Sequence, residues 1–402
     1  MNGIRHKKCG VVVGVVSSRG FTLVELVIVM AMFMGIIIIS SQAFNKIVSV
    51  SKQQVTSSES DTQGVIGLEM LRVDLEHAGY GLPWLLSSVA EFAEGQAAAN
   101  SLAPGIDTEQ FNDTFNITSD SNKVPRAVQA AASTSDGRDY LVIKSIMAGM
   151  NDTVKKWAYV EGLDAASRIK TWESNNFTAN ERVITVDSRT KRLVAANPPA
   201  NALSYVSTTA TDFSYAITAA DMTPPAAFQP RQDTDVFVVY GVSPSSDLRA
   251  PYNRVDYFVK RPATAGAMPS RCANGTGILY KAVMNHTGGG FTPYPLVECI
   301  ADMQVVFNVA ADGNNGIDVD QGGLTGLSAK EVRQQLKMIK VYIVAHEGGR
   351  DTSFSYGAGK DLVVGEGSGR TLDLKAMVGS DDYKYYRWKT YKLVVTPKNI
   401  NY

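Results

Sequence analysis

The sequence predicts an α+β protein in which a long amino-terminal helix precedes a mostly antiparallel β body. Three observations predict this layout. An apolar run near the amino terminus is long enough to cross a bilayer, the following residues stay helix-compatible to about residue 79, and strand-like runs separated by turn residues fill the chain after residue 136. The 402 residues also leave ample chain for a body of one or two lobes.

Composition argues against two classes of protein. Hydrophobic residues make up 45% of the chain, and Lys+Arg equal Asp+Glu at 39 each. We therefore expect neither a disordered chain nor a basic surface that binds nucleic acid. The first twenty residues contain Arg5, Lys7, Lys8 and Arg19 but no acid. Removal of this segment would leave a mildly acidic protein.

The apolar run extends from Phe21 to Ile39. At a rise of 1.5 Å per residue it spans about 28 Å, close to the hydrocarbon thickness of a bilayer. No second run of this kind follows, and the basic residues before it favour a cytoplasmic amino terminus. We therefore expect a single transmembrane pass with the body on the far side. A cleaved secretory signal is the alternative, although the run is longer than a usual signal core.

Glu25 lies inside this apolar run. A carboxylate in the membrane is costly unless a cation is near, so it marks a functional position by default. The surrounding residues Arg19-Gly20-Phe21-Thr22-Leu23-Val24-Glu25 resemble the cleavage and methylation motif of type IV prepilins. The resemblance implies that a prepilin peptidase cuts between Gly20 and Phe21, that residues 1–20 are a leader, and that the new terminal Phe21 is methylated.

The same resemblance implies a role for Glu25 in assembly, where it neutralises the amino terminus of a neighbouring subunit. This role agrees with electrostatics, because a buried carboxylate and a buried ammonium each lose hydration and each is tolerated mainly beside the other. In the isolated subunit we expect Glu25 to lie in lipid without a partner and to pair only in the filament.

Residues 21–79 are expected to form one transmembrane and assembly helix. No proline occurs between Ser40 and Gly79, and Leu68, Leu71 and Leu75 recur on one helical face. Gly79 and Gly81 then provide stop signals. The segment from Leu68 to Gly81 also resembles the end of the long helix in PilW-type minor pilins. After it, residues 80–136 are predicted to be a connection or insertion whose Ala-, Ser- and Asn-rich part, 87–135, lies on the surface.

Residues 137–402 are expected to form the β-rich body. β-branched and aromatic residues gather in short runs between turn residues, which is typical of antiparallel sheet. The predicted strands cover residues 140–144, 157–160, 182–186, 236–240, 255–259, 277–283, 303–309, 338–344 and 391–395. One helix is expected among them, because Ser328 and Glu331 have capping-box spacing and Val332, Leu336 and Ile339 follow at a helical period.

The order of these last elements is similar to the carboxyl-terminal half of PilW-like proteins. Together with the amino terminus, the resemblance covers residues 19–81 and 230–400. It implies a type IV pilin-like fold and a structural minor pilin that takes part in pilus assembly or initiation at the tip. It also implies a single-pass inner-membrane protein with a periplasmic body, whose partners are prepilin peptidase and other minor and major pilins. A type II secretion minor pseudopilin and a pilus-tip adhesin are the alternatives.

Cys272 and Cys299 are the cysteines that remain after leader removal. An even count in an oxidising compartment predicts a disulfide between them, in line with the carboxyl-terminal disulfides of the pilins that the chain resembles. Two separate buried thiols are the alternative. No Cys-x-x-Cys or Cys/His cluster has the spacing of a structural zinc site.

The acidic turn at residues 312–320 is a candidate calcium site. It places Asp312, Asn314, Asp318 and Asp320 among glycines, and hard oxygen ligands at this density suit Ca²⁺. A solvated Asx turn is the alternative, because the spacing departs from that of an EF-hand. No other cofactor is expected. Motifs of phosphate loops, zinc proteases and serine hydrolases are incomplete or missing in the sequence, so we expect no enzyme activity.

Overall fold

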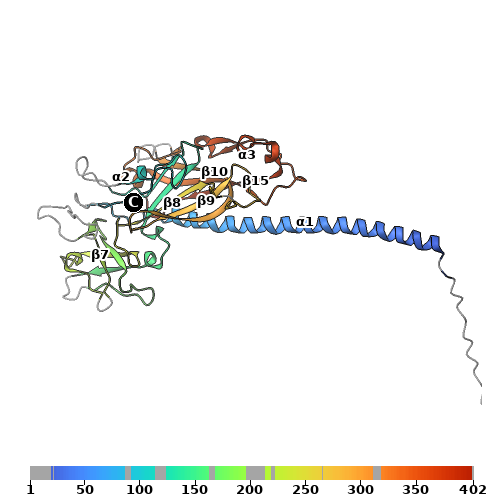
Figure 1. Ribbon diagram of the computed structural model, residues 1–402. Coiled ribbons are helices and arrows are strands. Elements are labelled where there is room, and N and C mark those ends of the chain that lie inside the picture. Colours follow the sequence, from blue (N-terminus) through green and yellow to red (C-terminus); the bar gives the residue numbers. More distant parts are fainter. Residues whose placement is uncertain are drawn as a thin grey trace, which may run out of the picture. The chain divides into compact units, whose positions relative to one another are not determined.

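The computed structural model describes residues 20, 22–86, 92–113, 124–162, 168–195, 213–218, 222–264, 266–310 and 318–400. The chain divides into two compact units, Met1–Val55 and Thr56–Tyr402. Helix α1, Leu23–Glu76, contributes residues to both units, and the remaining elements belong to the second (Figure 1). The predicted layout of an amino-terminal apolar helix and an antiparallel sheet-rich body is confirmed.

The second unit is built on an 8-stranded sheet in which every pair of neighbouring strands is antiparallel. Its strands follow the order β1-β2-β8-β9-β10-β12-β15, and β11 pairs with β10 off this path. Their bounds are Val128–Ala132 (β1), Asp139–Ser145 (β2), Asn253–Lys260 (β8), Gly277–Met284 (β9), Phe291–Ala310 (β10), Asp318–Gln321 (β11), Leu336–Glu347 (β12) and Arg387–Val395 (β15).

A 5-stranded antiparallel sheet is inserted between β2 and β8. It contains Trp157–Glu161 (β3), Val236–Ser243 (β7), Arg182–Asp187 (β4), Leu193–Val194 (β5) and Ser214–Ala216 (β6). One face of this sheet has a small core of its own, which includes Val160, Val183 and Val239. Ile184 and Val186 belong instead to the main core, because successive strand residues point to opposite faces.

Short elements complete the described second unit. They are the hairpin of β13, Asp361–Val364, with β14, Arg370–Asp373, the helices α2, Ala329–Gln335, and α3, Leu374–Val378, and six 3₁₀ helices. The 3₁₀ helices are Thr108–Phe111 (η1), Ile146–Ala148 (η2), Asp152–Lys155 (η3), Ala226–Phe228 (η4), Glu366–Ser368 (η5) and Asp381–Tyr385 (η6). Each of the nine runs predicted as strands lies within an observed strand.

The predicted helix after Ser328 is shorter than the periodicity indicated. Its capping box is present, with the Ser328 side chain accepting from the Glu331 backbone N–H and Glu331 bonded back to Ser328. The helix nevertheless ends at Gln335, and Leu336 begins β12. β12 is hydrogen-bonded to β10 on one side and β15 on the other, so ladder bonds on both edges outweigh continuation of the helical period.

The prediction that residues 87–135 lie on the surface is wrong for much of their described part. Leu102, Ile106 and Phe111 are buried against β2, β8 and β9, in a cluster that includes Tyr140 and Phe258. The rings of Phe111 and Tyr140 stack at 5.3 Å. The sequence did not reveal this packing, because its apolar residues follow no regular period here. An irregular segment can bury apolar residues without any fixed spacing.

Buried charges also fix this segment to the sheet. The ammonium of Lys144 in β2 lies 2.6 Å from Glu94 Oε2 and 2.6 Å from Asp113 Oδ2, and both Lys144 and Glu94 are almost fully buried. Nearby, Arg254 in β8 pairs with Asp256 at 2.8 Å and donates to Asn112 Oδ1 at 2.6 Å. Buried charges are tolerated when they are paired in this way, so the segment between α1 and β1 is an integral part of the body.

Candidate functional site

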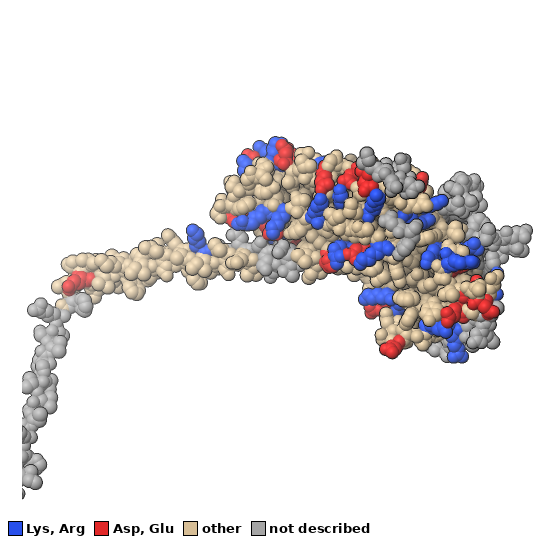
Figure 2. All heavy atoms as spheres, turned by 180° about the vertical axis from the view of Figure 1, so that it is seen from behind, with Lys and Arg blue, Asp and Glu red and all other residues tan. Residues whose placement is uncertain are grey.

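The first candidate feature is the membrane segment. Leu23–Val48 of α1 comprises 26 residues; its most apolar stretch of 18 residues has a mean hydropathy of 2.7, and none of that stretch is buried within the protein. At 1.5 Å per residue it is about 39 Å long, more than the roughly 30 Å of a hydrocarbon core. Figure 2 shows that charged side chains are sparse over the helix. The described chain therefore has one helix long and apolar enough to cross a membrane.

Glu25 is hydrogen-bonded at the start of this helix. Its Oε2 accepts from the Thr22 backbone N–H at 3.0 Å and from the Thr22 hydroxyl at 2.9 Å, and the Glu25 N–H donates to the same hydroxyl at 3.3 Å. This reciprocal arrangement is a capping box. Glu25 thus has hydrogen bonds within its own chain, and the expectation that it pairs with a cation only in the filament stays a prediction. Gly20 is exposed, and Phe21 lies outside the described residues.

The carboxyl-terminal turns of α1 are fixed to the large sheet. Leu68, Leu71 and Leu75 belong to the main core. Between them, Asp74 Oδ2 lies 2.6 Å from the Lys281 ammonium of β9 and accepts from the Tyr257 hydroxyl of β8 at 2.6 Å. Burial raises the pKa of Asp74, and the neighbouring Lys281 opposes that shift. Apolar packing and a buried ion pair thus hold the end of the helix.

Sequence reasoning did not identify the Asp74–Lys281–Tyr257 contact. The signal was present, because an acid at position 74 falls on the same helical face as Leu71, Leu75 and Ala78, all of which are buried. An acid on the apolar face of an amphipathic helix indicates a buried partner. The identity of that partner depends on the pairing of β8 with β9, which brings Lys281 opposite Tyr257.

The helix ends in a turn that requires its glycines. Gly79 and Gly81 have φ of 80° and 70°, a region that L side chains rarely adopt. A Cβ on Gly81 would lie 2.4 Å from Ile146 Cγ1. The predicted stop signals therefore end the helix and let the chain pass close to the sheet.

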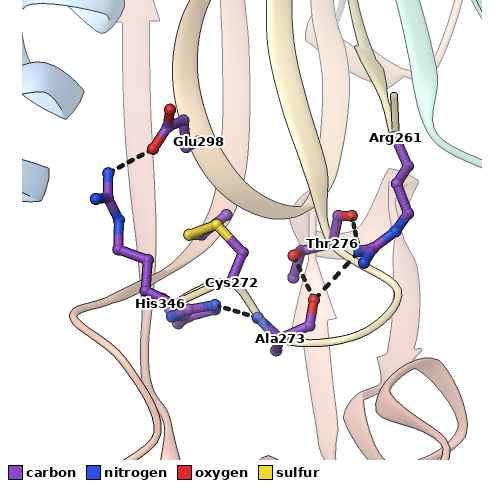
Figure 3. Close-up of a disulfide and its surroundings, with 8 residues drawn as sticks. Arg261, Cys272, Ala273, Thr276, Glu298 and His346 are labelled. Atoms are coloured by element: carbon purple, nitrogen blue, oxygen red, sulfur yellow. Dashed lines mark hydrogen bonds and ion pairs between the residues drawn. A yellow bond between two sulfur atoms is a disulfide. The ribbon is translucent and has the colours of Figure 1, made fainter. Parts of the chain in front are cut away.

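Cys272 and Cys299 are joined by a disulfide, with their Cα atoms 4.8 Å apart. The bond connects the segment before β9 to β10. Figure 3 shows the disulfide at Cys272 with His346 and Glu298 nearby. Cys299 has φ of 58° and lies where the register of β9 with β10 shifts between Val297 and Ile300. An ion pair between Arg271 and Glu298 joins the residues next to the two cysteines.

His346 of β12 packs beside the disulfide. Its Nε2 accepts from the Ala273 backbone N–H at 2.9 Å, and its ring lies 4.6 Å from the ring of Tyr386. Burial lowers the pKa of His346 to about 4. The ligand atoms of Cys272, Cys299 and His346 lie within 4.8 Å of one another. With the two sulfurs bonded to each other, neither is the thiolate that metal binding requires, so this group is a structural cluster.

In the described part of the acidic turn, the carboxylates of Asp318 and Asp320 are each paired with a lysine. Asp318 Oδ1 lies 2.7 Å from the ammonium of Lys337, and Asp320 Oδ2 lies 2.6 Å from that of Lys340. The hydrogen bond from Lys340 lowers the pKa of Asp320. Asp312 and Asn314 lie outside the described residues. Calcium binding stays a prediction, and the ion would compete with two ammonium groups.

Comparison with known proteins gives no relative: no family model, no curated protein and no solved structure matches the chain. The features that bear on function are therefore the apolar helix, the capped Glu25, the fixed helix end and the disulfide.

Proposed function

We propose that this chain is a PilW-like minor pilin, a structural subunit with a type IV pilin-like fold. Prepilin peptidase removes residues 1–20, and the mature subunit takes part in initiating or assembling a type IV pilus at its tip. The observation that carries the proposal is the peptidase motif around Gly20 and Phe21, placed directly before an apolar helix with one carboxylate, Glu25.

The position of Glu25 supports a role in subunit contact. The described residues Leu26–Asn45 include no charged side chain, so Glu25 is the first charge met from the amino end of the helix. Thr22 donates two hydrogen bonds to the Glu25 carboxylate, and among the residues that the structure describes none is a cation paired with it. The ammonium of a neighbouring processed subunit would supply that cation in the membrane.

The fixed end of α1 supports a role in assembly as well. A helix that packs with its neighbours in a filament must hold its own body firmly. Leu68, Leu71 and Leu75, with the Asp74–Lys281 pair, meet that need. In this proposal the body is periplasmic, where the Cys272–Cys299 bond is stable. A type II secretion pseudopilin would use the same helix, and identification of co-purifying subunits separates the two systems.

Processing tests the proposal. We expect cells with active prepilin peptidase to yield a chain that begins at Phe21 and carries one methyl group on its terminal nitrogen, as read by intact-mass and amino-terminal peptide spectrometry. Gly20→Val should retain the leader, because a bulky residue replaces the small one at the cut. An intact leader on the wild-type chain in the same cells contradicts the proposal.

A matched pair of variants separates the charge of Glu25 from its capping bonds. Glu25→Gln keeps an oxygen that accepts from Thr22 but removes the charge, whereas Thr22→Val removes the hydroxyl bond and keeps the charge. We expect the Gln variant to be processed but absent from sheared pilus fractions, and the Val variant to be present in them. Normal incorporation of Glu25→Gln would refute the assembly role.

A further inference from the structure

A cavity of about 510 Å³ lies where three loops of the second unit meet. The loops are the turn 149–151 after η2, residues 243–246 at and after the end of β7, and residues 285–287 after β9. Tyr294 of β10 lines the same cavity. Its volume is within the range of about 300–1,000 Å³ typical of small-molecule sites.

Internal hydrogen bonds hold the polar walls of this cavity in place. Asn253 donates to the carbonyls of Ile146 at 2.8 Å and Val242 at 3.2 Å, and its Oδ1 lies 3.1 Å from His286 Nε2. The other ring nitrogen of His286, Nδ1, accepts from the Arg249 backbone N–H at 3.2 Å. Both ring nitrogens are therefore satisfied, and the orientation of the imidazole is fixed.

Several donors of the lining remain available to a ligand. Asn151 uses its Oδ1 to accept from the Val154 N–H, and Ser243 uses its Oγ to accept from the Ser246 N–H. In the described part of the chain, the Asn151 amide N–H groups and the hydroxyl hydrogen of Ser243 have no acceptor, and the hydroxyl of Thr287 has no partner. These groups belong to three separate loops that converge on one space.

None of the residues that line the cavity is Lys, Arg, Asp or Glu. Burial lowers the pKa of His286 to about 4, so its ring is neutral at physiological pH. A charged ligand would lose hydration here without gaining an opposite charge. The lining also exposes apolar surface, since Met150 is 49% and Tyr294 39% exposed. The lining therefore suits an uncharged ligand that has many hydroxyl groups and an apolar face.

We propose that this cavity binds a neutral saccharide. Its hydroxyl groups accept from Asn151 and Ser243 and exchange hydrogen bonds with Thr287, and the C–H face of one sugar ring lies against the ring of Tyr294. The electron-rich face of an aromatic ring attracts such polarised C–H groups. This binding function is separate from pilus assembly and does not rest on it.

Ligand-observed saturation-transfer NMR on the full chain tests the site. The protein is held in a polyoxyethylene detergent, because sugar-based detergents would compete. The probes are lactose, cellobiose and chitobiose, with glucuronate and a capped Gly-Ser-Gly peptide as comparators. We expect transfer to at least one of the three disaccharides and little to glucuronate or the peptide. Transfer to none of the three, or stronger transfer to either comparator, would overturn the proposal.

Substitutions of lining residues test whether the saccharide binds in this cavity. Tyr294→Ala should weaken the best disaccharide at least tenfold, whereas Tyr294→Phe should retain it because the ring remains. Ser246→Trp fills the space and should abolish transfer. Trp157→Ala is the matched control, because Trp157 is a 43% exposed aromatic residue that does not line the cavity. Saccharide binding unchanged in both Tyr294→Ala and Ser246→Trp would place the ligand elsewhere and refute the site.

Discussion

His346 shows how burial controls charge at the scale of a residue. Its ring is 3% exposed, packs against Tyr386 and Trp388, and accepts a hydrogen bond from the Ala273 N–H. An imidazolium would lose hydration and could not accept that bond, and the nearby Arg271 adds repulsion, so the pKa falls to about 4. The neutral ring thus stabilises the fold beside the disulfide only while it stays unprotonated.

Acid should therefore destabilise the protein through His346. The unfolded chain binds a proton near pH 6.5 that the folded chain does not bind until about pH 4, so the stabilisation is complete above pH 6.5 and lost as the pH falls toward 4. The loss by pH 5 is about 2 kcal/mol. Thermal unfolding of the wild type and of a variant without this imidazole, each at pH 7 and pH 5, measures it by difference.

His346→Gln is the control for this effect, because glutamine still offers an acceptor to Ala273 but does not titrate. Asp139, whose pKa burial raises to about 7, contributes with the opposite sign, since its stabilisation is lost as the pH rises toward 7. That contribution is common to both proteins and cancels in their difference. Equal losses of stability in wild type and variant between pH 7 and pH 5 would show that His346 does not carry the effect.

At the scale of elements, the disulfide joins a turn-rich segment to the long strand β10. Cys272 and Cys299 are 27 residues apart in sequence, and residues between them form β9 and the start of β10. Closing a loop of this size restricts the unfolded chain and contributes about 3–4 kcal/mol in the chain-entropy description. The hydrogen bond of His346 and the Arg271–Glu298 pair hold the same corner.

We expect the mature, denatured protein to show no thiol that reacts with maleimide, and two after reduction. The precursor should show one additional thiol from Cys9, so a Cys9→Ser precursor is the matched control. Cys272→Ser with Cys299→Ser should lower the free energy of unfolding by about 3 kcal/mol. Two reactive thiols in the unreduced mature chain would favour the alternative of separate buried cysteines.

At the scale of the whole molecule, the two units differ in whether their hydrophobic side chains are buried or exposed. In the described chain, every buried residue lies at or after position 64. The second unit therefore holds the cores, while the hydrophobic side chains of the first unit are exposed and suit lipid. Residues 64–76 of α1 belong with the body, because they supply Leu68, Leu71, Leu75 and Asp74 to its interior.

Two deletions test this division. Removal of Met1–Val55 should leave Thr56–Tyr402 soluble and cooperatively folded, as measured by circular dichroism on heating. Removal of residues 1–76 should abolish folding, because each lost core leucine costs about 2–5 kcal/mol and Lys281 loses its buried partner. Together these losses reach the net stability of about 5–15 kcal/mol of an ordinary domain. Similar melting temperatures for the two fragments would contradict the division.

Local chemistry in the sequence determined the apolar helix, its stop at Gly79 and Gly81, the nine main strand runs and the capping box at Ser328. These features depend on period, on glycine conformations and on short side-chain bonds between neighbours, all of which are readable along the chain. Only the tertiary structure decided that Leu102, Ile106 and Phe111 are buried. It also decided that α2 stops at Gln335, that Asp74 meets Lys281, and that three distant loops form one cavity. Such contacts depend on which strands pair and in which register, and pairing is set by the burial of whole faces.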